Sequence, residues 1–338
     1  MESVDNKNSI FKEMEEDIYS SKLPEIEKQK ILKNILKLKE QKINIMITGA
    51  TGCGKSSTIN ALFNTQVAKV GVGVDPETME ITKYDLDNLV LWDSPGLGDG
   101  KEADNRHSKN IIKKLAECDE HGNALIDLVL VLLDGSTRDL GTSYELINQV
   151  IIPNLGENKK NKRDRILVAI NQCDVAMKGR YWNFEENKPE PTLIQFLDDK
   201  VESVRKRIKE GTGVDITPIY YSAGFKDQGE EQRPYNLSKL LYFIIQHTPK
   251  EKRLAYVNNI SDKDEMWKDS DDLKDYSTEI KQSFADTVSE CAADGADVGE
   301  DIGKIFGKTG ETIGRAAGRI IGTVAGVGKA VWNVITSW

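Results

Sequence analysis

A lysine and two serines follow a glycine-rich stretch directly behind an apolar segment of the chain. The stretch GATGCGKSS has the spacing G-x-x-x-x-G-K-S, in which main-chain N–H groups can surround phosphate groups because glycine has no side chain to block their approach. A helix that begins at the end of this loop adds a favourable dipole for an anion. We expect the loop to bind a nucleoside triphosphate through Gly49, Ala50, Thr51, Gly52, Cys53, Gly54, Lys55, Ser56 and Ser57.

Several of these side chains could place charge and a metal ion at the phosphates. Lys55 is expected to contact the outer phosphates as a point charge, and the Ser56 hydroxyl to bind Mg²⁺. The motif DSPG, which begins at Asp93 and ends at Gly96, closes the apolar segment 88–93. The Asp93 carboxylate could hold Mg²⁺ through water, and the Gly96 N–H could contact the terminal phosphate. Taken alone, the D-x-x-G spacing more often marks a simple turn.

The motif NQCD indicates which base the site would select. It begins at Asn171 and ends at Asp174, at the end of the apolar segment 165–171, which is where open α/β sheets bind ligands. A carboxylate can accept hydrogen bonds from both N1–H and the exocyclic amine of guanine, whereas adenine has neither donor in those positions. The motif therefore predicts guanine. The expected base-side contacts are Asn171, Gln172, Asp174, Ser222, Ala223 and Gly224.

Short apolar segments alternate with amphipathic stretches in the middle of the chain. Near-continuous apolar strands that alternate with helices are typical of a mostly parallel sheet with helices on both faces, so an α/β fold is expected. The alternating segment 80–87 suits an edge strand, and 236–248 suits the closing helix. The expected buried strands are 43–48, 88–93, 126–134, 165–171 and 216–222.

Helical patterns flank this domain on both sides. Residues 8–40 have apolar positions at helical spacing, with Pro24 separating two helices. Residues 258–301 are strongly acidic and are predicted to form a solvated connector with some helix. Beyond them glycine recurs at every fourth position, which requires a packing reason because glycine is a poor helix former. The predicted divisions are an N-terminal helical segment 1–40, a nucleotide-binding domain 41–250, an acidic connector 251–294 and a glycine-rich helical segment 295–338.

The composition excludes several classes of protein. A net charge of −9 disfavours attraction to nucleic acid or anionic membranes on average. The four cysteines form no C-x-x-C pair, which argues against a zinc site and a disulfide framework. The first residues are acidic and polar without a secretory signal, and no apolar run reaches the roughly 18 residues of a membrane span. We expect a cytoplasmic protein in which His107, His121 and His247 are surface residues.

The order of these motifs resembles that of the TRAFAC-class GTPases, in particular the Era-like bacterial group labelled ribosome-binding GTPases. The resemblance covers residues 40–250 and rests on GATGCGKSSTINALF, DSPGLGD, NQCD and SAG. It implies a Ras-like P-loop fold, Mg²⁺-dependent hydrolysis of GTP to GDP and nucleotide-controlled switch loops. Gly52 stands where potassium-activated relatives have asparagine, which makes the chain similar to septin-like and immunity-related GTPases, many of which work as dimers.

Two departures from the family pattern affect the expected activity. Gln172 stands where a lysine stem usually covers the base, so modest affinity is expected. Leu97 stands where Ras-type enzymes have the glutamine that orients the attacking water. We therefore expect slow turnover unless a homodimer formed through the GTPase domain, or another partner, supplies a group. In the first switch we choose Thr78 over Thr82, which lies in an expected strand. The expected catalytic residues are Lys55, Thr78 and Gly96, and the expected Mg²⁺ ligands are Ser56, Thr78 and Asp93.

The glycine-rich tail leaves two interpretations open. Its small residues form a smooth stripe that another helix could approach closely, either from the N-terminal helices or from a second copy. Its isoleucines, valines and tryptophans accompany lysines and arginines, which suits a helix at the inner face of a membrane. The competing function is thus a GTP-dependent membrane-associating or self-assembling module. Ribosome or RNA binding is suggested only by the family label, since the core domain has no recognisable RNA-binding motif.

Overall fold

The centre of the molecule is a six-stranded sheet, seen in a computed structural model that describes residues 9–64, 80–98, 100–227, 230–293 and 305–320. The strand order is β2-β3-β1-β4-β5-β8, and all neighbours are parallel except β2 and β3. The expected α/β fold is confirmed, and the alternating segment forms the edge strand β2. The strands are β1 (Ile43–Gly49), β2 (Thr82–Leu86), β3 (Leu89–Asp93), β4 (Leu128–Asp134), β5 (Ile166–Asn171) and β8 (Ile219–Tyr220).

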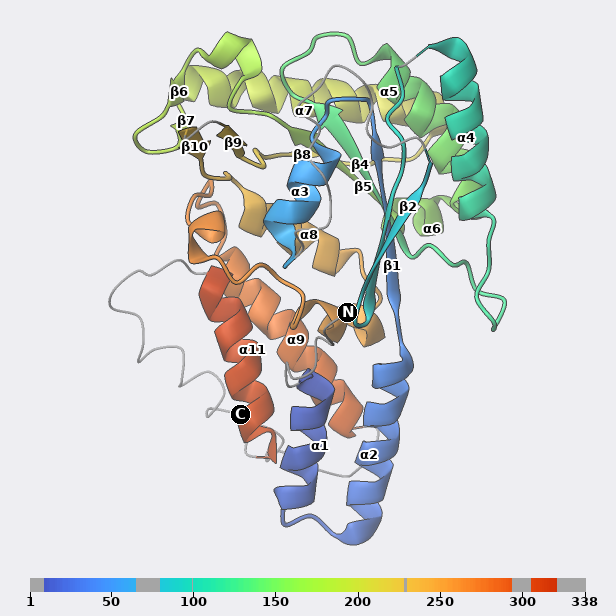
Figure 1. Ribbon diagram of the computed structural model, residues 1–338, viewed down its shortest axis with the longest axis vertical. Helices are drawn as coiled ribbons and strands as arrows, with labels where there is room; N and C mark the ends of the chain where they lie inside the picture. Colours follow the sequence, from blue (N-terminus) through green and yellow to red (C-terminus); the bar gives the residue numbers. More distant parts are fainter. Residues whose placement is uncertain (1–8, 65–79, 99, 228–229, 294–304, 321–338) are drawn as a thin grey trace.

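Helices cover both faces of this sheet (Figure 1), because successive side chains of a strand point to opposite sides. On β1, Ile45 and Ile47 pack into one hydrophobic cluster, whereas Met46 packs into the other. The first cluster includes side chains of α3 (Lys55–Leu62) and α8 (Leu237–Gln246). The second includes side chains of α4 (Lys101–Leu115), the π-helical turn η1 (Leu146–Ile151) that continues α5 (Gly141–Glu145), and α7 (Pro191–Thr212).

The connection from β5 to α7 contains unusual backbone geometry. Met177, Lys178, Tyr181 and Asn187 all have positive φ angles, which cost free energy in residues other than glycine. Such conformations persist only where surrounding contacts hold them.

The remaining elements that the structure describes around this domain are short. They are η2 (Ile152–Asn154), α6 (Lys159–Asp164), η3 (Ala176–Gly179), β6 (Trp182–Asn183), β7 (Lys188–Pro189), β9 (Phe225–Asp227), β10 (Glu230–Gln232), η4 (Lys250–Tyr256) and η5 (Asp264–Trp267).

Helices from both ends of the chain pack together at the end of the sheet where β1 begins (Figure 1). Pro24 separates the first two of them, as predicted. Their buried side chains belong to the same cluster as the first face of the sheet, so the terminal helices and the sheet share a core. The helices are α1 (Ile10–Ser20), α2 (Glu25–Glu40), α9 (Tyr276–Ala293) and α11 (Gly307–Ile320).

A carboxylate on α1 caps the start of α11. Asp17 accepts hydrogen bonds from the N–H groups of Lys308 (3.2 Å) and Thr309 (2.9 Å) and from the Thr309 hydroxyl (2.8 Å). The first N–H groups of a helix have no partner within the helix, and the helix dipole favours a negative charge there. Asp17 therefore joins the two ends of the described chain through a buried, charge-assisted contact.

The acidic segment after Pro249 contains helix, as expected, but α9 is packed into the core, so the expectation that this part is solvated is wrong. Ile280, Phe284 and Val288 are buried at four-residue spacing. The helix contacts α8 and α2, and the Asn34 side chain of α2 donates to the Cys291 carbonyl at 3.1 Å. The charged side chains of α9 lie away from its packed face and none of them is buried, so a strongly charged sequence still forms a helix that packs into the core.

The glycines of α11 do not form its packing face. Ile313 and Ala316 are buried, and the helix contacts α1 and α9. A Cβ atom at Gly310, Gly314 or Gly318 would meet nothing within 4 Å. Within the described part of the chain, nothing therefore covers the glycine stripe of α11. None of the described helices combines the length and the apolar composition that a membrane span requires.

Candidate nucleotide site

The predicted phosphate loop lies between the end of β1 and the first turn of α3, at the carboxyl end of the parallel strands. Lys55, the first residue of α3, directs Nζ back to the carbonyl oxygens of Gly49 (3.4 Å) and Ala50 (3.3 Å). Ser56 and Ser57 follow it in the first helical turn and are half-buried. The ammonium and the positive end of the helix dipole therefore act on the same loop, which suits an anionic ligand.

Two side chains of the NQCD motif hold this loop in place. The Asn171 amide donates to the Cys53 carbonyl at 2.9 Å, and the Gln172 amide donates to the Gly52 carbonyl at 2.8 Å. The Asn171 side-chain oxygen also accepts from the Ala223 N–H at 2.9 Å. The phosphate loop, the NQCD motif and the SAG segment are far apart in the sequence, and the buried Asn171 connects all three.

Gly54 shows why this arrangement needs glycine. Its φ angle is +87°, in the left-handed region that side chains disfavour. A Cβ atom at this position would also collide with the Asn171 side chain. A larger residue would therefore break the connection between the loop and β5.

The D-x-x-G motif packs directly against the phosphate loop. Leu97 forms a bridge with Ala50, in which the Thr51 N–H donates to the Leu97 carbonyl (2.9 Å) and the Leu97 N–H donates to the Gly49 carbonyl (3.3 Å). A Cβ atom on Gly96 would collide with the Thr51 backbone, so this close approach also requires glycine. The structure therefore places Gly96 beside the loop where it is expected to meet the terminal phosphate.

Asp93 ends β3 with a buried carboxylate. Asp93 is 1% exposed, and its Oδ1 has no hydrogen-bond partner among the described residues. Burial raises the pKa of Asp93 to about 6, and the nearby Lys55 ammonium opposes this only in part. An unpartnered buried carboxylate is costly to keep. Its position next to the loop suits a site that a cation completes.

Asp174 is the second buried carboxylate of the site. It is 5% exposed, and its Oδ1 likewise has no partner within the described part of the chain. The preceding residue, Cys173, donates its N–H to the Tyr221 carbonyl at 3.2 Å, which places Asp174 beside the segment Ser222–Gly224. A carboxylate with open acceptor positions is suited to the two donors of guanine. The residues predicted to recognise the base thus lie together.

Comparison with known families agrees with this arrangement. Residues 44–172 match the family described as 50S ribosome-binding GTPase. That range contains the phosphate loop, the DSPG motif and the start of NQCD. Residues 44–172 form a TRAFAC-class GTPase domain. The chain spans about half the length of the curated relatives it matches, because it covers 50% of each of the two proteins described next.

The chain is similar to two uncharacterized proteins of Escherichia coli (strain K12). YkfA is 30% identical over 158 residues, and YfjP is 31% identical over 160 residues; each match covers 46% of this chain. Among solved structures, Toc33 from Arabidopsis thaliana in complex with Mg²⁺ and GMPPNP aligns with 17% identity and a TM-score of 0.42, over 72% of this chain and 98% of that chain.

The structure places every predicted site residue of the GTPase domain except Thr78, which lies outside the described residues. The phosphate-loop residues, Asp93, Gly96 and the base-side residues gather at the carboxyl ends of β1, β3, β5 and β8. Their contacts with a nucleotide remain predictions.

Burial raises the pKa of both the Cys53 and the Cys173 thiols, so neither is activated as a thiolate.

His107 was expected at the surface, and this expectation is wrong. The residue is 1% exposed, and its Nδ1 lies 3.1 Å from the Gly96 carbonyl oxygen. His107 lies on the same face of α4 as the buried Ile111 and Leu115, at four-residue spacing, and this face turns the ring into the GTPase domain. That spacing was the signal in the sequence that could have identified it.

Two further residues near the site were missed, and both bind main-chain groups. Asp104 accepts a hydrogen bond from the Gly98 N–H at 2.8 Å. Lys200 of α7 donates to the carbonyls of Gly135 and Thr137, each at 2.6 Å, and burial lowers the pKa of its ammonium. Spacing in the sequence gives no signal for the Lys200 contacts, because their partners are backbone atoms 63 and 65 residues away along the chain.

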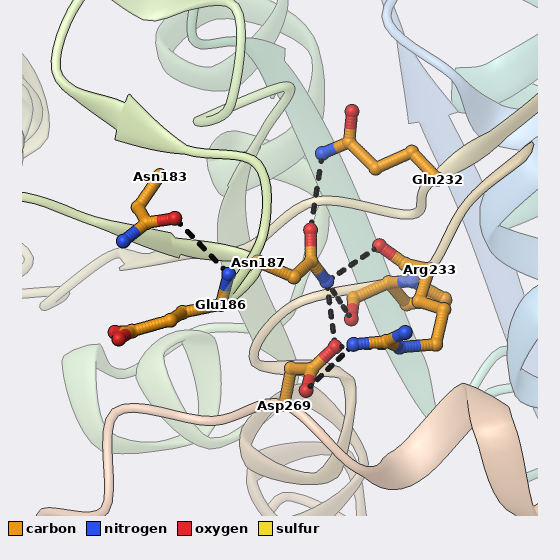
Figure 2. Close-up of polar contacts among 7 residues, drawn as sticks. Asn183, Glu186, Asn187, Gln232, Arg233 and Asp269 are labelled. Atoms are coloured by element: carbon orange, nitrogen blue, oxygen red, sulfur yellow. Dashed lines mark hydrogen bonds and ion pairs between the residues drawn. The ribbon is translucent and has the colours of Figure 1, made fainter.

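The chain that follows the SAG segment is held by a buried asparagine (Figure 2). Asn187 donates from Nδ2 to the Arg233 carbonyl (3.0 Å) and to the Asp269 carboxylate (2.7 Å). The Arg233 guanidinium also donates to Asp269 at 3.0 Å. Close by in the sequence, Tyr235 exchanges two backbone hydrogen bonds with Ser222, each 2.9 Å long. The base side of the GTPase domain is therefore tied to the segment that leads to α9.

Proposed function

We propose that this chain is a Mg²⁺-dependent GTP-binding and GTP-hydrolysing switch protein with slow intrinsic turnover. The observation that supports this most directly is the pair of buried carboxylates, Asp93 and Asp174, each with an oxygen that has no partner among the described residues. In the strand order they lie on either side of β1 and its phosphate loop. One suits the cation side of a nucleotide, and the other suits the donors of guanine.

The residues at the loop fit Mg²⁺. This ion prefers oxygen ligands and is usually held by one or two carboxylates together with phosphate oxygens and water. Asp93 offers its unpartnered Oδ1, Ser56 offers a hydroxyl in the first turn of α3, and Thr78 is the proposed third ligand. When bound, the ion would neutralise charge on the outer phosphates.

The chemistry is attack of water on the terminal phosphate, with release of GDP and phosphate. Lys55 would neutralise charge on the outer phosphates, and the Gly96 N–H would hold the terminal one. Leu97 is 5% exposed and has no group that can orient a water molecule. We therefore propose that a second copy, joined through the GTPase domain, or another partner supplies the missing group.

Single-turnover GTP hydrolysis tests this proposal. At low protein concentration we expect a rate on the order of 10⁻³ s⁻¹, as in GTPases that lack a supplied arginine. The rate per protein should rise at higher concentration if a second copy completes the site. A Lys55→Ala variant, expected to be inactive, controls for contaminating phosphatases. A fast rate that does not depend on protein concentration would contradict slow intrinsic turnover.

A second function is supported by the open glycine stripe of α11, at Gly310, Gly314 and Gly318. Such a stripe could receive another helix or lie at a membrane surface, which would make the chain a GTP-dependent assembly or membrane-associating module. We expect the full chain to sediment with anionic vesicles in the presence of a GTP analogue, and a variant that lacks residues 295–338, and with them the glycine stripe, to lose most of this binding. Absence of sedimentation with either GDP or the analogue would exclude the membrane form of this function.

A further inference from the structure

Two side chains on α4 form hydrogen bonds with the backbone that follows Asp93. Asp104 accepts from the Gly98 N–H at 2.8 Å, and the His107 Nδ1 lies 3.1 Å from the Gly96 carbonyl oxygen. The two residues are three positions apart, so they lie on neighbouring parts of one helix face. The segment between Gly96 and Gly98 is therefore bound to α4 at both of its ends.

The Gly96–Leu97 peptide is fixed on two sides. Its carbonyl faces His107, and its N–H donates to the Gly49 carbonyl of the phosphate loop at 3.3 Å. Since a carbonyl oxygen can only accept, Nδ1 of His107 must carry the proton. The ring is 1% exposed, and its other nitrogen, Nε2, has no partner in the described structure. This buried ring thus makes one directed polar contact, and that contact is to the D-x-x-G glycine.

We propose that His107 and Asp104 are positioning residues for recognition of the terminal phosphate. This inference rests on the proposed GTPase function, in which the Gly96 N–H contacts that phosphate. With the following peptide held by His107 and Gly49, Gly96 has little freedom to turn its N–H away. GDP has no terminal phosphate, so the effect should be specific to the triphosphate. Neither side chain needs to touch the nucleotide.

Paired substitutions separate the hydrogen bonds from the bulk of the side chains. His107→Phe fills the ring volume without a donor, whereas His107→Asn keeps an amide N–H near the position of Nδ1. Asp104→Ala removes the acceptor, whereas Asp104→Asn keeps a carbonyl oxygen. Arg106→Ala, at an exposed position of the same helix, is the matched control.

Calorimetric affinities for GDP and for a nonhydrolysable GTP analogue, both with Mg²⁺, give the decisive readout. We expect the Phe and Ala variants to weaken binding of the analogue about tenfold, in line with loss of one polar contact, and to leave GDP binding within about twofold. The two Asn variants and Arg106→Ala should behave like the unsubstituted chain.

Equal weakening of both nucleotides would show a merely structural role and overturn the inference, as would unchanged affinity for the analogue. Should His107→Phe fail to fold, the half-buried Asp104 still decides the question, because its replacement leaves the core intact. If the unsubstituted chain binds neither nucleotide, the proposed GTPase function itself fails, which is distinct from a failure of the variants.

Discussion

Replacing Asp93 with asparagine is expected to stabilise the nucleotide-free chain at pH 7 and to abolish most of its GTP hydrolysis. The Asp93 pKa is raised from 3.8 to about 6 by burial, so its charged form is disfavoured in the folded state. A shift of this size corresponds to about 3 kcal/mol of unfolding free energy at neutral pH. Asparagine has the same shape without the charge, and we expect a gain of about 1–3 kcal/mol in urea unfolding.

The gain in unfolding free energy from Asp93→Asn should depend on pH in a defined direction. The folded pKa of Asp93 lies above its unfolded value, so between about pH 4 and pH 6 the folded state binds more protons than the unfolded state. The stability of the unsubstituted chain therefore falls through this range as the pH rises. The advantage of Asp93→Asn is expected in full above pH 6 and should vanish near pH 4.

The rate of GTP hydrolysis by Asp93→Asn should fall, although the stability of this variant rises. Without the carboxylate that we assign to Mg²⁺, we expect the turnover rate to fall by about a hundredfold or more. Asp85→Asn, an exposed substitution on β2, should change neither property. An Asp93→Asn variant that is less stable at pH 7, or that hydrolyses GTP at the original rate, would refute the role assigned to this residue.

The parts of the site that the sequence predicted are those determined by neighbouring residues. The loop from Gly49 to Ser57 could be predicted because its glycines, lysine and serines are adjacent, and because the apolar strand before it is continuous. Asp93 and Asp174 were predicted as site residues because Asp93 ends one buried strand and Asp174 closely follows another, and parallel strands end at one edge of a sheet. The structure places all of these residues at that edge.

What could not be predicted depends on contacts between distant segments. The four-residue spacing of His107 with Ile111 and Leu115 indicates the buried face of α4, but it does not indicate that the ring contacts the Gly96 carbonyl oxygen. The negative charge around α9 obscured the apolar spacing of Ile280, Phe284 and Val288. Asp17 gave no local signal at all, because the N–H groups that it caps belong to the opposite end of the chain.

Replacing Asp174 with asparagine is expected to change the base that the site prefers. The Asp174 carboxylate is 5% exposed and has an oxygen without a partner among the described residues, so it can accept from both N1–H and the 2-amino group of guanine. Asparagine offers one acceptor and one donor group instead. Its amide would face the 2-amino group with a donor, and we expect affinity for GTP to fall by about a hundredfold.

The affinity of Asp174→Asn for xanthosine triphosphate should rise as its affinity for GTP falls. Xanthine has N1–H and a carbonyl at position 2, which match the oxygen and the N–H of an asparagine side chain. Competition binding of GTP, xanthosine triphosphate and ATP to both proteins measures the change directly. Because the substitution alters only the direction of hydrogen bonds, a general loss of affinity for all three nucleotides would indicate damage to the phosphate loop instead. Unchanged preference for GTP in Asp174→Asn would show that another residue reads the base.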